Sequence, residues 1–502
     1  MLICYYNKWK NAILGGKIMK ITKQKQELFC NIILIFLFLV LAFITFYNLG
    51  EFKVNDWDEA RHGVSAYEML KNKNYIINTY NYKNDYWNLK PPISFWIIML
   101  SYKLFGATIF SMRLYSALSI LILAICVVIF IKKKYSKFTA IIWLFLLCCC
   151  SPIYYSHMGR NGDADAIALL FLTISMLSML KIDTNIKNLY LAGFFFSLVF
   201  LTKSWHSLSI VAIGGLFLII TGLIKTIKLK EWIYFILSFI VPIGVWGTVR
   251  YFNDGSKFFV NMVQYDLLKR TSTGIEGNGQ NFFYYFKYLI THNLFQAFSI
   301  IILLIWFIIL LKKLKHNFLN KNDTIGYLLW IFVPLILFSL AKTKLDWYVI
   351  PIMIPVLMVT SIIFTTLIKN LNTNKILLGI VSFVFISLNL LNFIKIVNYI
   401  NNPLKDSLQD FITNKISTHT DLKGNNAYID VDTSNWSQSL LFLGEIEMDF
   451  KCNDGGISSY LNNNSKSILI TTKEKYLNNK DLNKENILIQ SNNGKYILIY
   501  KN

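Results

Sequence analysis

Long blocks of uncharged, apolar residues recur along this chain from residue 30 to about residue 396. Cys30–Tyr47 runs for eighteen residues without a charge, and Trp232–Val249 and Leu294–Leu311 are similar. About 20 such residues cross the hydrocarbon core of a bilayer as a helix, and a secretory signal peptide would supply only one such block. With 55% hydrophobic and 16% charged residues, the chain is too apolar for a soluble protein. The sequence therefore predicts a polytopic α-helical membrane protein.

The formal net charge of +22 is distributed in a way that indicates topology. Short lysine clusters separate the apolar blocks, at residues 132–137, 225–230 and 312–315. Lysine and arginine accumulate in the cytoplasmic loops of membrane proteins. These loops are therefore expected in the cytoplasm, together with the lysine-rich residues 1–29. The same distribution argues against a nucleic-acid-binding protein.

One short apolar block decides how many spans are counted. Ile93–Phe105 follows Pro91-Pro92 and contains Lys103, so it is predicted to lie at the membrane interface as an amphipathic helix. If it crossed the membrane, the cluster at 132–137 would lie outside. With the interfacial assignment the chain has about eleven transmembrane helices, and its lysine-rich loops all fall on the cytoplasmic side. The predicted spans are Cys30–Tyr47, Leu114–Ile131, Phe138–Cys150, Ala164–Leu180, Leu189–Leu201, Leu208–Ile224, Trp232–Val249, Leu294–Leu311, Ile325–Leu340, Val349–Ile368 and Ile376–Ile396.

The composition becomes polar after about residue 400, where Asn, Asp, Lys and Ser predominate. This tail contains four short runs typical of β-strands, namely Ala427–Val431, Ile468–Thr472, Ile487–Gln490 and Tyr496–Tyr500. After an odd number of spans the tail lies outside the cytoplasm. The sequence thus predicts a cytoplasmic segment (1–29), a transmembrane domain (30–400) and a small extracytoplasmic α/β domain (401–502).

Cysteine and histidine usage indicates neither disulfides nor a metal site. Of the seven cysteines, Cys452 alone lies in the polar tail, so no disulfide framework is expected. The sequence contains no CxxC motif and no His/Cys cluster, and no metal ligands are predicted. His157 and His206 flank outward loops and are interpreted as surface or locally satisfied groups. Trp347 is interpreted as part of the aromatic belt at the membrane interface.

Charged residues near a membrane surface are costly unless they are used, so the outward loops indicate where chemistry could occur. The first loop carries Asp58-Glu59-Ala60-Arg61 and, further on, Lys90-Pro91-Pro92. Taken alone, these motifs are explained by an acidic helix N-terminus and a snorkelling lysine. The loops at 151–163 and 341–348 add further acidic and cationic residues on the same membrane face. That combination favours a functional site over separate local explanations.

The motifs occur in an order that resembles one superfamily. They are Asp58-Glu59-x-Arg61, Lys90-Pro91-Pro92 with Phe95 and Trp96, Leu104-Phe105-Gly106, Arg113-Leu114, Arg160-x-x-x-x-Asp165, Leu201-Thr202-Lys203, and Ser339-Leu340-Ala341-Lys342-Thr343-Lys344 followed by Tyr348 and Pro351. The ordered set covers roughly residues 30–360 and lies on one membrane face, which gives the match its specificity. The chain resembles the membrane-embedded glycosyltransferases of the GT-C type, the superfamily of the protein O-mannosyltransferases and the lipid A aminoarabinose transferases, and is closer to its bacterial, family 39-like branch.

The resemblance implies a role for each matched residue. Asp58 would be the base that takes the acceptor's proton, with Glu59 beside it, and Asp165 would be a second carboxylate that orients acceptor or donor. The lipid phosphate would be held by Arg61, Lys90, Lys203, Arg270, Lys344 and Tyr348. Direct displacement of the phosphate by the acceptor would invert the anomeric centre, so no glycosyl-enzyme nucleophile is needed.

The sequence also departs from the aminoarabinose transferases. The acidic residue that commonly precedes Lys-Pro-Pro is Leu89 here, and a tyrosine two residues earlier is Trp87. The histidine expected in the long outward loop is not found in residues 271–281. A metal site built from that acid and histidine is therefore not predicted, no cofactor is assigned, and a divalent metal is an unsupported alternative. The same departures argue against aminoarabinose as the sugar.

The resemblance implies an inverting, polyprenyl-phosphate-sugar-dependent glycosyltransferase, a hexosyl- or pentosyltransferase, of the cytoplasmic (inner) membrane. It would act on the outer face, with an undecaprenyl carrier and a lipid, a glycolipid such as lipopolysaccharide, or a protein as acceptor. A lipid-linked-sugar flippase or other transporter, and a catalytically inactive scaffold, are the alternatives. Transporters usually carry ionisable groups near the bilayer midplane and show repeat symmetry. The apolar blocks here are nearly free of Asp, Glu and Arg.

Overall fold

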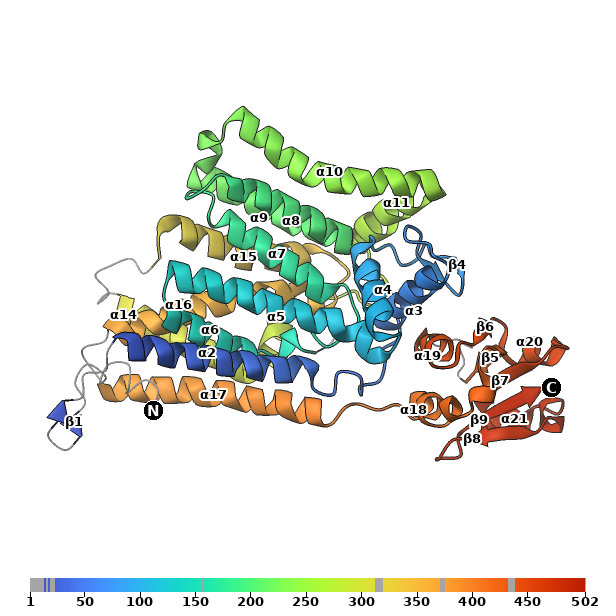
Figure 1. The fold of residues 1–502 in the computed structure, drawn as a ribbon. Coiled ribbons are helices and arrows are strands. Elements are labelled where there is room, and N and C mark those ends of the chain that lie inside the picture. Colours follow the sequence, from blue (N-terminus) through green and yellow to red (C-terminus); the bar gives the residue numbers. More distant parts are fainter. Residues whose placement is uncertain are drawn as a thin grey trace.

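A bundle of membrane-spanning helices carries a small α/β domain at one end (Figure 1). The computed structural model describes residues 13–14, 17–18, 23–155, 157–311, 319–370, 375–431 and 438–501. Each predicted span falls on a helix of the bundle. These helices are α2 (Lys23–Phe46), α5 (Ile109–Lys134), α6 (Lys137–Cys148), α7 (Asp165–Met179), α8 (Lys187–Lys203), α9 (Leu208–Thr221), α10 (Leu229–Asp254), α14 (Leu294–Leu311), α15 (Lys321–Leu340), α16 (Met353–Asn370) and α17 (Lys375–Asn401).

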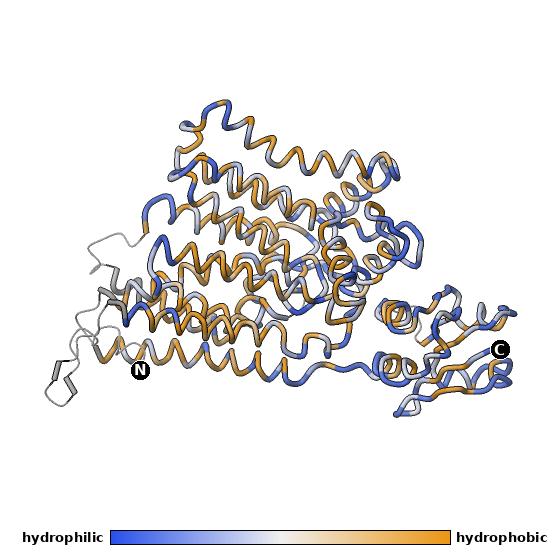
Figure 2. Tube along the Cα trace, in the orientation of Figure 1, coloured by the Kyte–Doolittle hydropathy of each residue, from blue (hydrophilic) through white to orange (hydrophobic). Residues whose placement is uncertain are grey.

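The bundle has the dimensions and composition of a membrane domain. Seven of its helical stretches, with α8 and α9 taken as one, are long and apolar enough to cross a bilayer, and the bent pair of α13 (Tyr284–His292) and α14 could form an eighth span. The helices α6 and α7 have only 12 and 15 residues, but most of their side chains are buried inside the bundle. Figure 2 shows apolar residues along the helices and polar residues at their ends. The polytopic membrane fold is confirmed.

The two ends of the bundle differ in what they carry. At one end the Lys134 ammonium at the close of α5 donates to the Leu180 carbonyl at 3.1 Å and pairs with Asp323 at the start of α15. At the other end the Asn48 amide, just after α2, donates to the Ile400 carbonyl of α17 at 3.1 Å. The α/β domain follows α17 and lies at this second end (Figure 1). The cluster at 132–137 and the α/β domain therefore occupy opposite ends, as the predicted topology requires.

The first loop folds over the second end of the bundle. It contains α3 (Asp58–Lys71), the hairpin of β3 (Thr79–Tyr80) and β4 (Lys83–Asn84), and α4 (Ile93–Phe105). Helix α4 packs between α3 and α5 and exposes Trp96, Leu100 and Leu104 on one face, beside Lys103. An apolar face with a flanking lysine is typical of a helix at the membrane interface. The remaining connections are η1 (Ser151–Ile153), η2 (Ser204–Ser207), η3 (Leu223–Thr226), α11 (Lys257–Asn261), η4 (Met262–Lys269), α12 (Arg270–Ser272), α13 and η5 (Asp346–Ile352).

A buried ion pair joins the first loop to the bundle. Glu59 of α3 and Arg113 of α5 are each 1% exposed and form two hydrogen bonds of 2.7 and 3.0 Å. Arg113 also donates to the backbone carbonyls of Leu49, Phe52 and Lys53, which follow α2. The Gly162 N–H donates to Glu59 Oε1 at 2.8 Å. One ion pair therefore ties together α2, α3, α5 and the loop before α7.

The C-terminal domain is an α/β unit whose sheet is covered by helices on both faces. Its sheet has the order β6-β5-β7-β9-β8, with β5 parallel to β6 and β7, and with β9 antiparallel to β7 and β8. Four of these strands coincide with the predicted runs, whereas β6 is only three residues long and was missed. The elements are α18 (Ser407–Asn414), η6 (Ile416–Thr418), η7 (Thr420–Leu422), β5 (Asn426–Asp430), α19 (Gln438–Met448), β6 (Lys451–Asn453), α20 (Gly456–Asn462), β7 (Ser467–Thr472), α21 (Lys473–Asn478), η8 (Leu482–Lys484), β8 (Ile487–Gln490) and β9 (Tyr496–Lys501).

This domain docks on the first loop through side chains that bind backbone groups. The Gln409 amide of α18 exchanges two 2.8 Å hydrogen bonds with the backbone of Val54. The Ser439 N–H of α19 donates to the Asp56 carboxylate at 2.7 Å. A Cβ added to Gly63 of α3 would lie 2.3 Å from the Phe442 ring, so glycine permits the close packing of α3 and α19. The domain is therefore closely packed against the loop that carries Asp58.

Two carboxyls meet in this interface. Glu68 of α3 and Glu445 of α19 are almost fully buried, and each lies within the electrostatic reach of the other. Among the described residues, neither oxygen of Glu445 accepts a hydrogen bond as an ionised carboxylate would require. Burial, together with the neighbouring Glu68, raises the pKa of Glu445 to about 10, and burial raises the pKa of Glu68 to about 7. One shared proton would satisfy both groups.

We expect this interface to weaken as the pH rises. Both carboxyls have a pKa in the folded protein above the ordinary 4.5, so their stabilising contribution is complete below pH ~4.5 and is lost as the pH rises through about 7. The thermal unfolding midpoint of the purified protein should fall between pH 5 and pH 8. Glu445→Gln should remove most of that dependence and raise the midpoint at pH 8. Glu474→Gln, an exposed control, should behave like wild type, and an unchanged pH profile in Glu445→Gln would rule out the shared proton.

The Glu59–Arg113 pair makes a separate prediction. Glu59→Gln leaves the Arg113 guanidinium buried without a countercharge, which is expected to cost about 3–5 kcal/mol of stability. The thermal unfolding midpoint in detergent should drop clearly, whereas the exposed Glu51→Gln control should not shift it. A Glu59→Gln protein as stable as wild type but devoid of activity would instead support the catalytic role that the sequence analysis assigned to Glu59.

Candidate active site

Five of the predicted site residues line one pocket at the end of the bundle that carries the α/β domain. We refer to it as the central pocket. Its walls come from α3, the segment before α4, the end of α8, the η4–α12 region and the start of η5. Its lining residues are Asp58, Trp87, Asn88, Leu89, Lys90, Lys203, Ser204, His206, Asp266, Arg270, Leu345, Trp347 and Tyr348. Segments nearly 300 residues apart in sequence thus converge on one site.

Asp58 is the first residue of α3, and its carboxylate points away from the helix. Lys90 Nζ lies 2.8 Å from Asp58 Oδ1. The N-cap residue of α3 is Trp57, which makes no side-chain capping hydrogen bond. Asp58 is the first residue inside the helix and therefore does not cap it. Burial alone would raise the pKa of the Asp58 carboxyl, but Lys90 and His157 hold it below its ordinary value. Asp58 is therefore an ionised carboxylate that can accept a proton.

Two further cation–carboxylate pairs lie beside the first. Lys203, the last residue of α8, pairs with Asp165, the first residue of α7, and both side chains are buried. Arg270 Nε lies 3.0 Å from Asp266 Oδ1, and Arg270 Nη1 donates to the Tyr348 hydroxyl at 3.4 Å. Each buried cation thus has a countercharge in place, which offsets much of the cost of removing it from water.

Apart from Asp165, which is paired with Lys203, three of the predicted site residues do not line the central pocket. Glu59 is committed to Arg113, so its predicted catalytic role has no geometric basis and is corrected to a structural one. Arg61 forms a bidentate pair with Asp85 at 2.7 and 2.9 Å and stacks on the Tyr80 and Trp87 rings. It supports the pocket wall at Trp87 instead of facing the pocket. The Glu59 and Arg61 side chains do not face the central pocket because each is paired with a buried partner of opposite charge, Arg113 and Asp85 respectively.

Lys344 is the third residue that lies outside the central pocket. Its ammonium donates to the carbonyl of Ala341, and its side chain does not line the pocket. Of the residues predicted to bind the lipid phosphate, Lys90, Lys203, Arg270 and Tyr348 line the central pocket and remain candidates.

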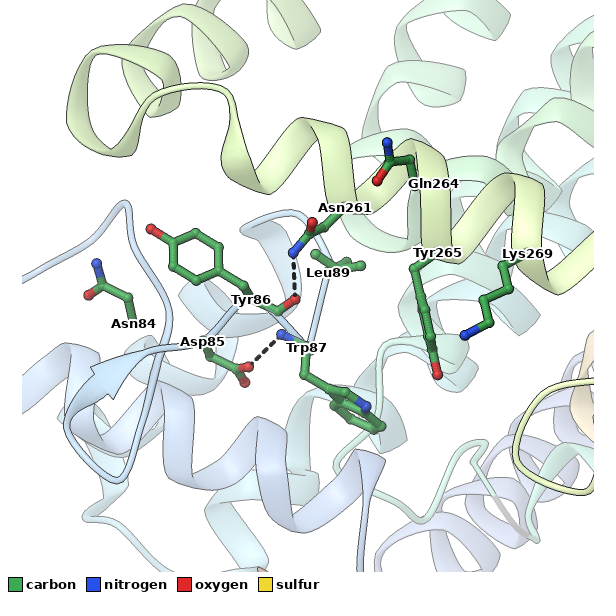
Figure 3. A pocket seen from close by; sticks show the side chains of 9 residues that line it. All are labelled: Asn84, Asp85, Tyr86, Trp87, Leu89, Asn261, Gln264, Tyr265 and Lys269. Atoms are coloured by element: carbon green, nitrogen blue, oxygen red, sulfur yellow. Dashed lines mark hydrogen bonds between the residues drawn. The ribbon is translucent and has the colours of Figure 1, made fainter.

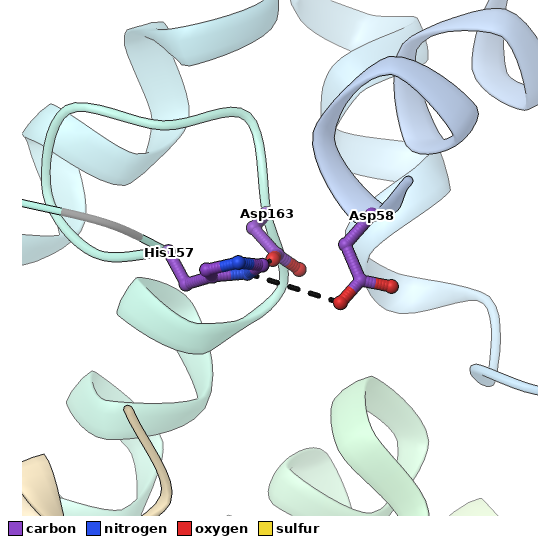
Figure 4. A group of neighbouring side chains, drawn as sticks. All are labelled: Asp58, His157 and Asp163. Atoms are coloured by element: carbon purple, nitrogen blue, oxygen red, sulfur yellow. Dashed lines mark hydrogen bonds and ion pairs between the residues drawn. The ribbon is translucent and has the colours of Figure 1, made fainter. Parts of the chain in front are cut away.

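Two histidines of the site, His157 and His206, were not predicted as site residues, because their partners are set by the tertiary structure. His157 lies between Asp58 and Asp163 (Figure 4): its Nδ1 is hydrogen-bonded to Asp163 and lies 3.8 Å from Asp58 Oδ2. Its ring stacks on Trp347, which is therefore a site residue and not only part of an aromatic belt. Burial would lower the pKa of His157, but the two carboxylates raise it. No regular sequence spacing connects Asp58, His157 and Asp163. One local signal was available, because Asp163 lies two positions before Asp165 of the Arg160-x-x-x-x-Asp165 motif.

His206 is the second histidine whose interpretation changes. It lies half-buried in the wall of the central pocket, with its ring edge-on to Tyr348 at a centroid distance of 4.4 Å. Its Nδ1 lies 3.3 Å from the Lys203 carbonyl. The residue is locally satisfied, as expected, but it belongs to the site and not to the surface.

A mostly apolar cavity opens from the central pocket into the bundle. It shares Lys203, His206, Trp347 and Tyr348 with the central pocket and continues between α7, α8 and α15. Its inner part is lined by Ala168, Leu169, Leu172, Val199, Pro334 and Phe338. Charged groups at the mouth and aliphatic groups behind them match the chemistry of a ligand with an anionic head and a hydrocarbon tail, but the cavity holds only about 30 Å³, so the helices would have to separate to admit such a tail.

A side pocket of about 530 Å³ adjoins the central pocket on the other side (Figure 3). One wall is the loop at 84–89, and the other is η4. Trp87 and Leu89 line both pockets, so the two are neighbours. Amide, aromatic and charged side chains line it, namely Asn84, Asp85, Tyr86, Trp87, Asn261, Gln264, Tyr265 and Lys269. The Asn261 amide donates to the Tyr86 carbonyl at 3.3 Å and joins the two walls.

Comparisons with known proteins agree with the fold and the motifs. The family model described as dolichyl-phosphate-mannose-protein mannosyltransferase matches residues 89–246. The undecaprenyl phosphate-alpha-4-amino-4-deoxy-L-arabinose arabinosyl transferase of Wigglesworthia glossinidia brevipalpis is 29% identical over 338 residues, 63% of this chain and 56% of that protein. The transferase of the same name from Shewanella sediminis is 26% identical over 319 residues, 61% of this chain and 54% of that protein. The chain thus spans about half the length of these relatives.

The fold is shared over nearly the whole chain with a solved structure. The crystal structure of ArnT from Cupriavidus metallidurans bound to undecaprenyl phosphate superposes with a TM-score of 0.69 and 14% identity, covering 93% of this chain and 98% of that one. The apo form superposes with a TM-score of 0.66. With the family model, the curated relatives and the ordered motifs, this fold makes the chain similar to the GT-C type membrane glycosyltransferases, the superfamily of the protein O-mannosyltransferases and the lipid A aminoarabinose transferases.

Proposed function

We propose that this protein is an inverting glycosyltransferase that moves a sugar from a polyprenyl-phosphate carrier to an acceptor hydroxyl at the outer face of the membrane. One observation carries the proposal: an ionised carboxylate, Asp58, lies within a group of cations at the mouth of an apolar cavity. A base is needed for the acceptor, cations for the departing phosphate, and apolar space for the lipid. The central pocket and the adjoining cavity combine all three.

The apolar cavity and the three cations support a lipid-phosphate donor. Lys90, Lys203 and Arg270 each keep unused N–H donors beyond those that pair with Asp58, Asp165 and Asp266, because an ammonium has three and a guanidinium five. A phosphate can therefore bind without breaking the existing pairs. As the bond between the sugar and the phosphate breaks, negative charge grows on the phosphate and these contacts strengthen. The carrier chain would extend between α7, α8 and α15.

The transfer step uses Asp58 as the base. The acceptor hydroxyl loses its proton to the Asp58 carboxylate, its oxygen forms a bond to the anomeric carbon, and the bond from that carbon to the phosphate oxygen breaks. The electron pair leaves with the carrier phosphate. One displacement inverts the anomeric configuration. Asp165 would position Lys203, to which it is paired.

The acceptor and the location are proposed on the same basis. The side pocket adjoins the central pocket, which Asp58 lines, and offers room for part of a lipid, glycolipid or protein acceptor. The arabinosyl transferases to which this chain is similar favour an undecaprenyl-linked donor and a lipid acceptor. We assign the protein to the inner membrane, with the central pocket and the α/β domain outside the cytoplasm, because the lysine cluster at 132–137 lies at the opposite end.

A transporter and an inactive scaffold are the competing functions. The charged residues of the candidate site gather at one end of the bundle, whereas transporters commonly carry them near the bilayer midplane. An inactive scaffold would have no need for an ionised carboxylate within reach of three cations. Neither alternative explains why the apolar cavity and the side pocket both adjoin the pocket that Asp58 lines.

Asp58→Asn is expected to abolish transfer in a folded protein, because the amide keeps the shape of the carboxylate but cannot take a proton. The loss should be at least on the order of 10²–10⁴-fold, the usual contribution of a positioned base. The measurement is transfer of labelled sugar from the polyprenyl-phosphate donor in membranes, with insertion checked by fluorescence-detected size exclusion.

The matched control for this test is Asp56→Asn, two residues away and outside the central pocket. Its amide oxygen can still accept from the Ser439 N–H, so this variant should stay active. Equal activity in both variants would refute the base assignment and favour the transporter or the scaffold.

Arg270→Ala is expected to weaken the sugar donor's binding without unfolding the protein. Removing a charge-assisted contact of about 1.5–3 kcal/mol corresponds to roughly a ten- to hundredfold rise in the apparent KM for the lipid-phosphate donor. Lys342→Ala removes a positive charge from an exposed position of the nearby loop and is expected to change this KM little. A donor KM that is equal in wild type and Arg270→Ala would contradict the phosphate assignment.

A further inference from the structure

A groove of about 590 Å³ lies between the first loop and the α/β domain. One wall is formed by the end of α3 and the hairpin of β3 and β4, and the other by β6 and the turn before it (Figure 1). Asp58 and Lys71 are the first and last of the 14 residues of α3; Asp58 lines the central pocket, whereas Lys71 lines the groove. At a rise of 1.5 Å per residue they lie about 20 Å apart. The groove is therefore separate from the site of the base, and the proposed transfer step does not use it.

The hairpin presents an aromatic residue to the groove at a conformational cost. Its two turn residues, Asn81 and Tyr82, both have left-handed backbone angles, with φ of 52° and 56°. Such a turn favours asparagine first and glycine second, and a bulky residue in this conformation is rare. The Tyr82 N–H donates to Glu68 Oε2 at 2.9 Å, and the Asn81 amide donates to Asp454 Oδ1 at 3.2 Å. Tyr82 nevertheless remains 45% exposed, and strain retained at an exposed aromatic residue points to a ligand contact.

The facing wall supplies polar groups that bind hydroxyls. Asn453 of β6 and Asp454 line it, together with the exposed Lys451. Lys83 of the hairpin lies 3.2 Å from Asp454 Oδ2, so an ion pair joins the two walls. Amide, carboxylate and ammonium groups together can donate to and accept from hydroxyls, and an aromatic ring covers the apolar face of a sugar ring. This combination fits a carbohydrate chain.

The loop that borders the groove continues into the side pocket. Residues 81–83 line the groove, and residues 84–87 line the side pocket. The side pocket in turn shares Trp87 and Leu89 with the central pocket. The central pocket, the side pocket and the groove therefore follow one another along a single loop. A small acceptor fills the side pocket alone, whereas an extended acceptor reaches the groove.

We propose that the groove binds the glycan chain of an extended acceptor, several sugar units away from the hydroxyl that is glycosylated. This inference rests on the proposed function and specifies its acceptor as a saccharide chain. Contacts at the groove hold the acceptor equally before and during the reaction. They therefore lower the KM for the acceptor and leave kcat unchanged.

A peptide is the competing ligand, because the edge of a sheet can bind a peptide as an added strand. The edge strand β6 has only three residues, so it offers few backbone partners to such a strand. The side chains of the groove, and not its sheet edge, therefore determine what binds there.

The test measures binding without any sugar donor, on the full-length protein in detergent. The probe is the mixture of oligosaccharides released by mild acid from the envelope glycolipids of cells that lack this gene, since that mixture contains the unmodified acceptor glycan. Saturation-transfer NMR should detect binding to the wild type. Tyr82→Gly should weaken this binding at least about tenfold, as the loss of a central aromatic contact does. The variant should stay folded, because Asn-Gly is the favoured sequence for this turn.

Two further variants complete the test. Asn453→Ala, on the facing wall, should also weaken binding. The matched control is Tyr75→Ala, a 51% exposed tyrosine of the same loop that does not line the groove, and it should bind like the wild type. In transfer assays, Tyr82→Gly should raise the apparent KM for the glycan acceptor about tenfold, with kcat and the donor KM unchanged.

Wild-type affinity in Tyr82→Gly would overturn the proposal, as would the absence of saturable oligosaccharide binding to the wild type. A tryptic digest of envelope proteins that binds through Tyr82 when the saccharides do not would assign the groove to peptides and overturn it too. A protein that binds the saccharides through Tyr82 and Asn453 but transfers no sugar would refute the proposed function and leave the groove standing. Transfer with a wild-type acceptor KM in Tyr82→Gly would refute the groove and leave the transfer function standing.

Discussion

The buried ion pair between Glu59 and Arg113 is the constraint on which the site depends. Asp58 directly precedes Glu59, and Asp163 directly follows Gly162, whose N–H donates to the Glu59 carboxylate. A single desolvated pair therefore places both aspartates. Because Arg113 also binds three backbone carbonyls that follow α2, α3 cannot shift without breaking several buried contacts at once. Such cooperation gives an ion pair a defined geometry that a surface pair would not have.

The site itself is a compact arrangement of opposite charges at the edge of an apolar bundle. Lys90, Lys203 and Arg270 each pair with a different carboxylate, so the empty pocket carries no unbalanced buried charge. This balance lets several charged groups exist where water is scarce. It also leaves the cations around one pocket with N–H donors to spare, so that the phosphate of the proposed donor would meet donors that are already in place.

The α/β domain contributes to the same geometry from the opposite side of α3. Its contacts with Val54, Asp56 and Gly63 lie immediately around the Asp58–Arg61 motif. The buried Glu68–Glu445 contact extends this interface toward the end of α3. A change in the docking of the domain would therefore reach the base through one short helix. This connection gives the domain a structural reason to pack on the first loop.

The sequence by itself determined the membrane class, the helices and much of the site. In a bilayer a long apolar block folds as an α-helix, because every backbone polar group must form a hydrogen bond within the segment. The candidate residues Asp58, Lys90, Asp165, Lys203 and Tyr348 could be named because ordered motifs carried them. Only the tertiary structure decided that Glu59 and Arg61 turn away to buried partners, and that His157 joins Asp58 and Asp163. Those outcomes depend on which side of α3 faces Arg113 and Asp85 and on how the loop before α7 returns to α3. Such long-range packing leaves no periodic or local signal in the sequence.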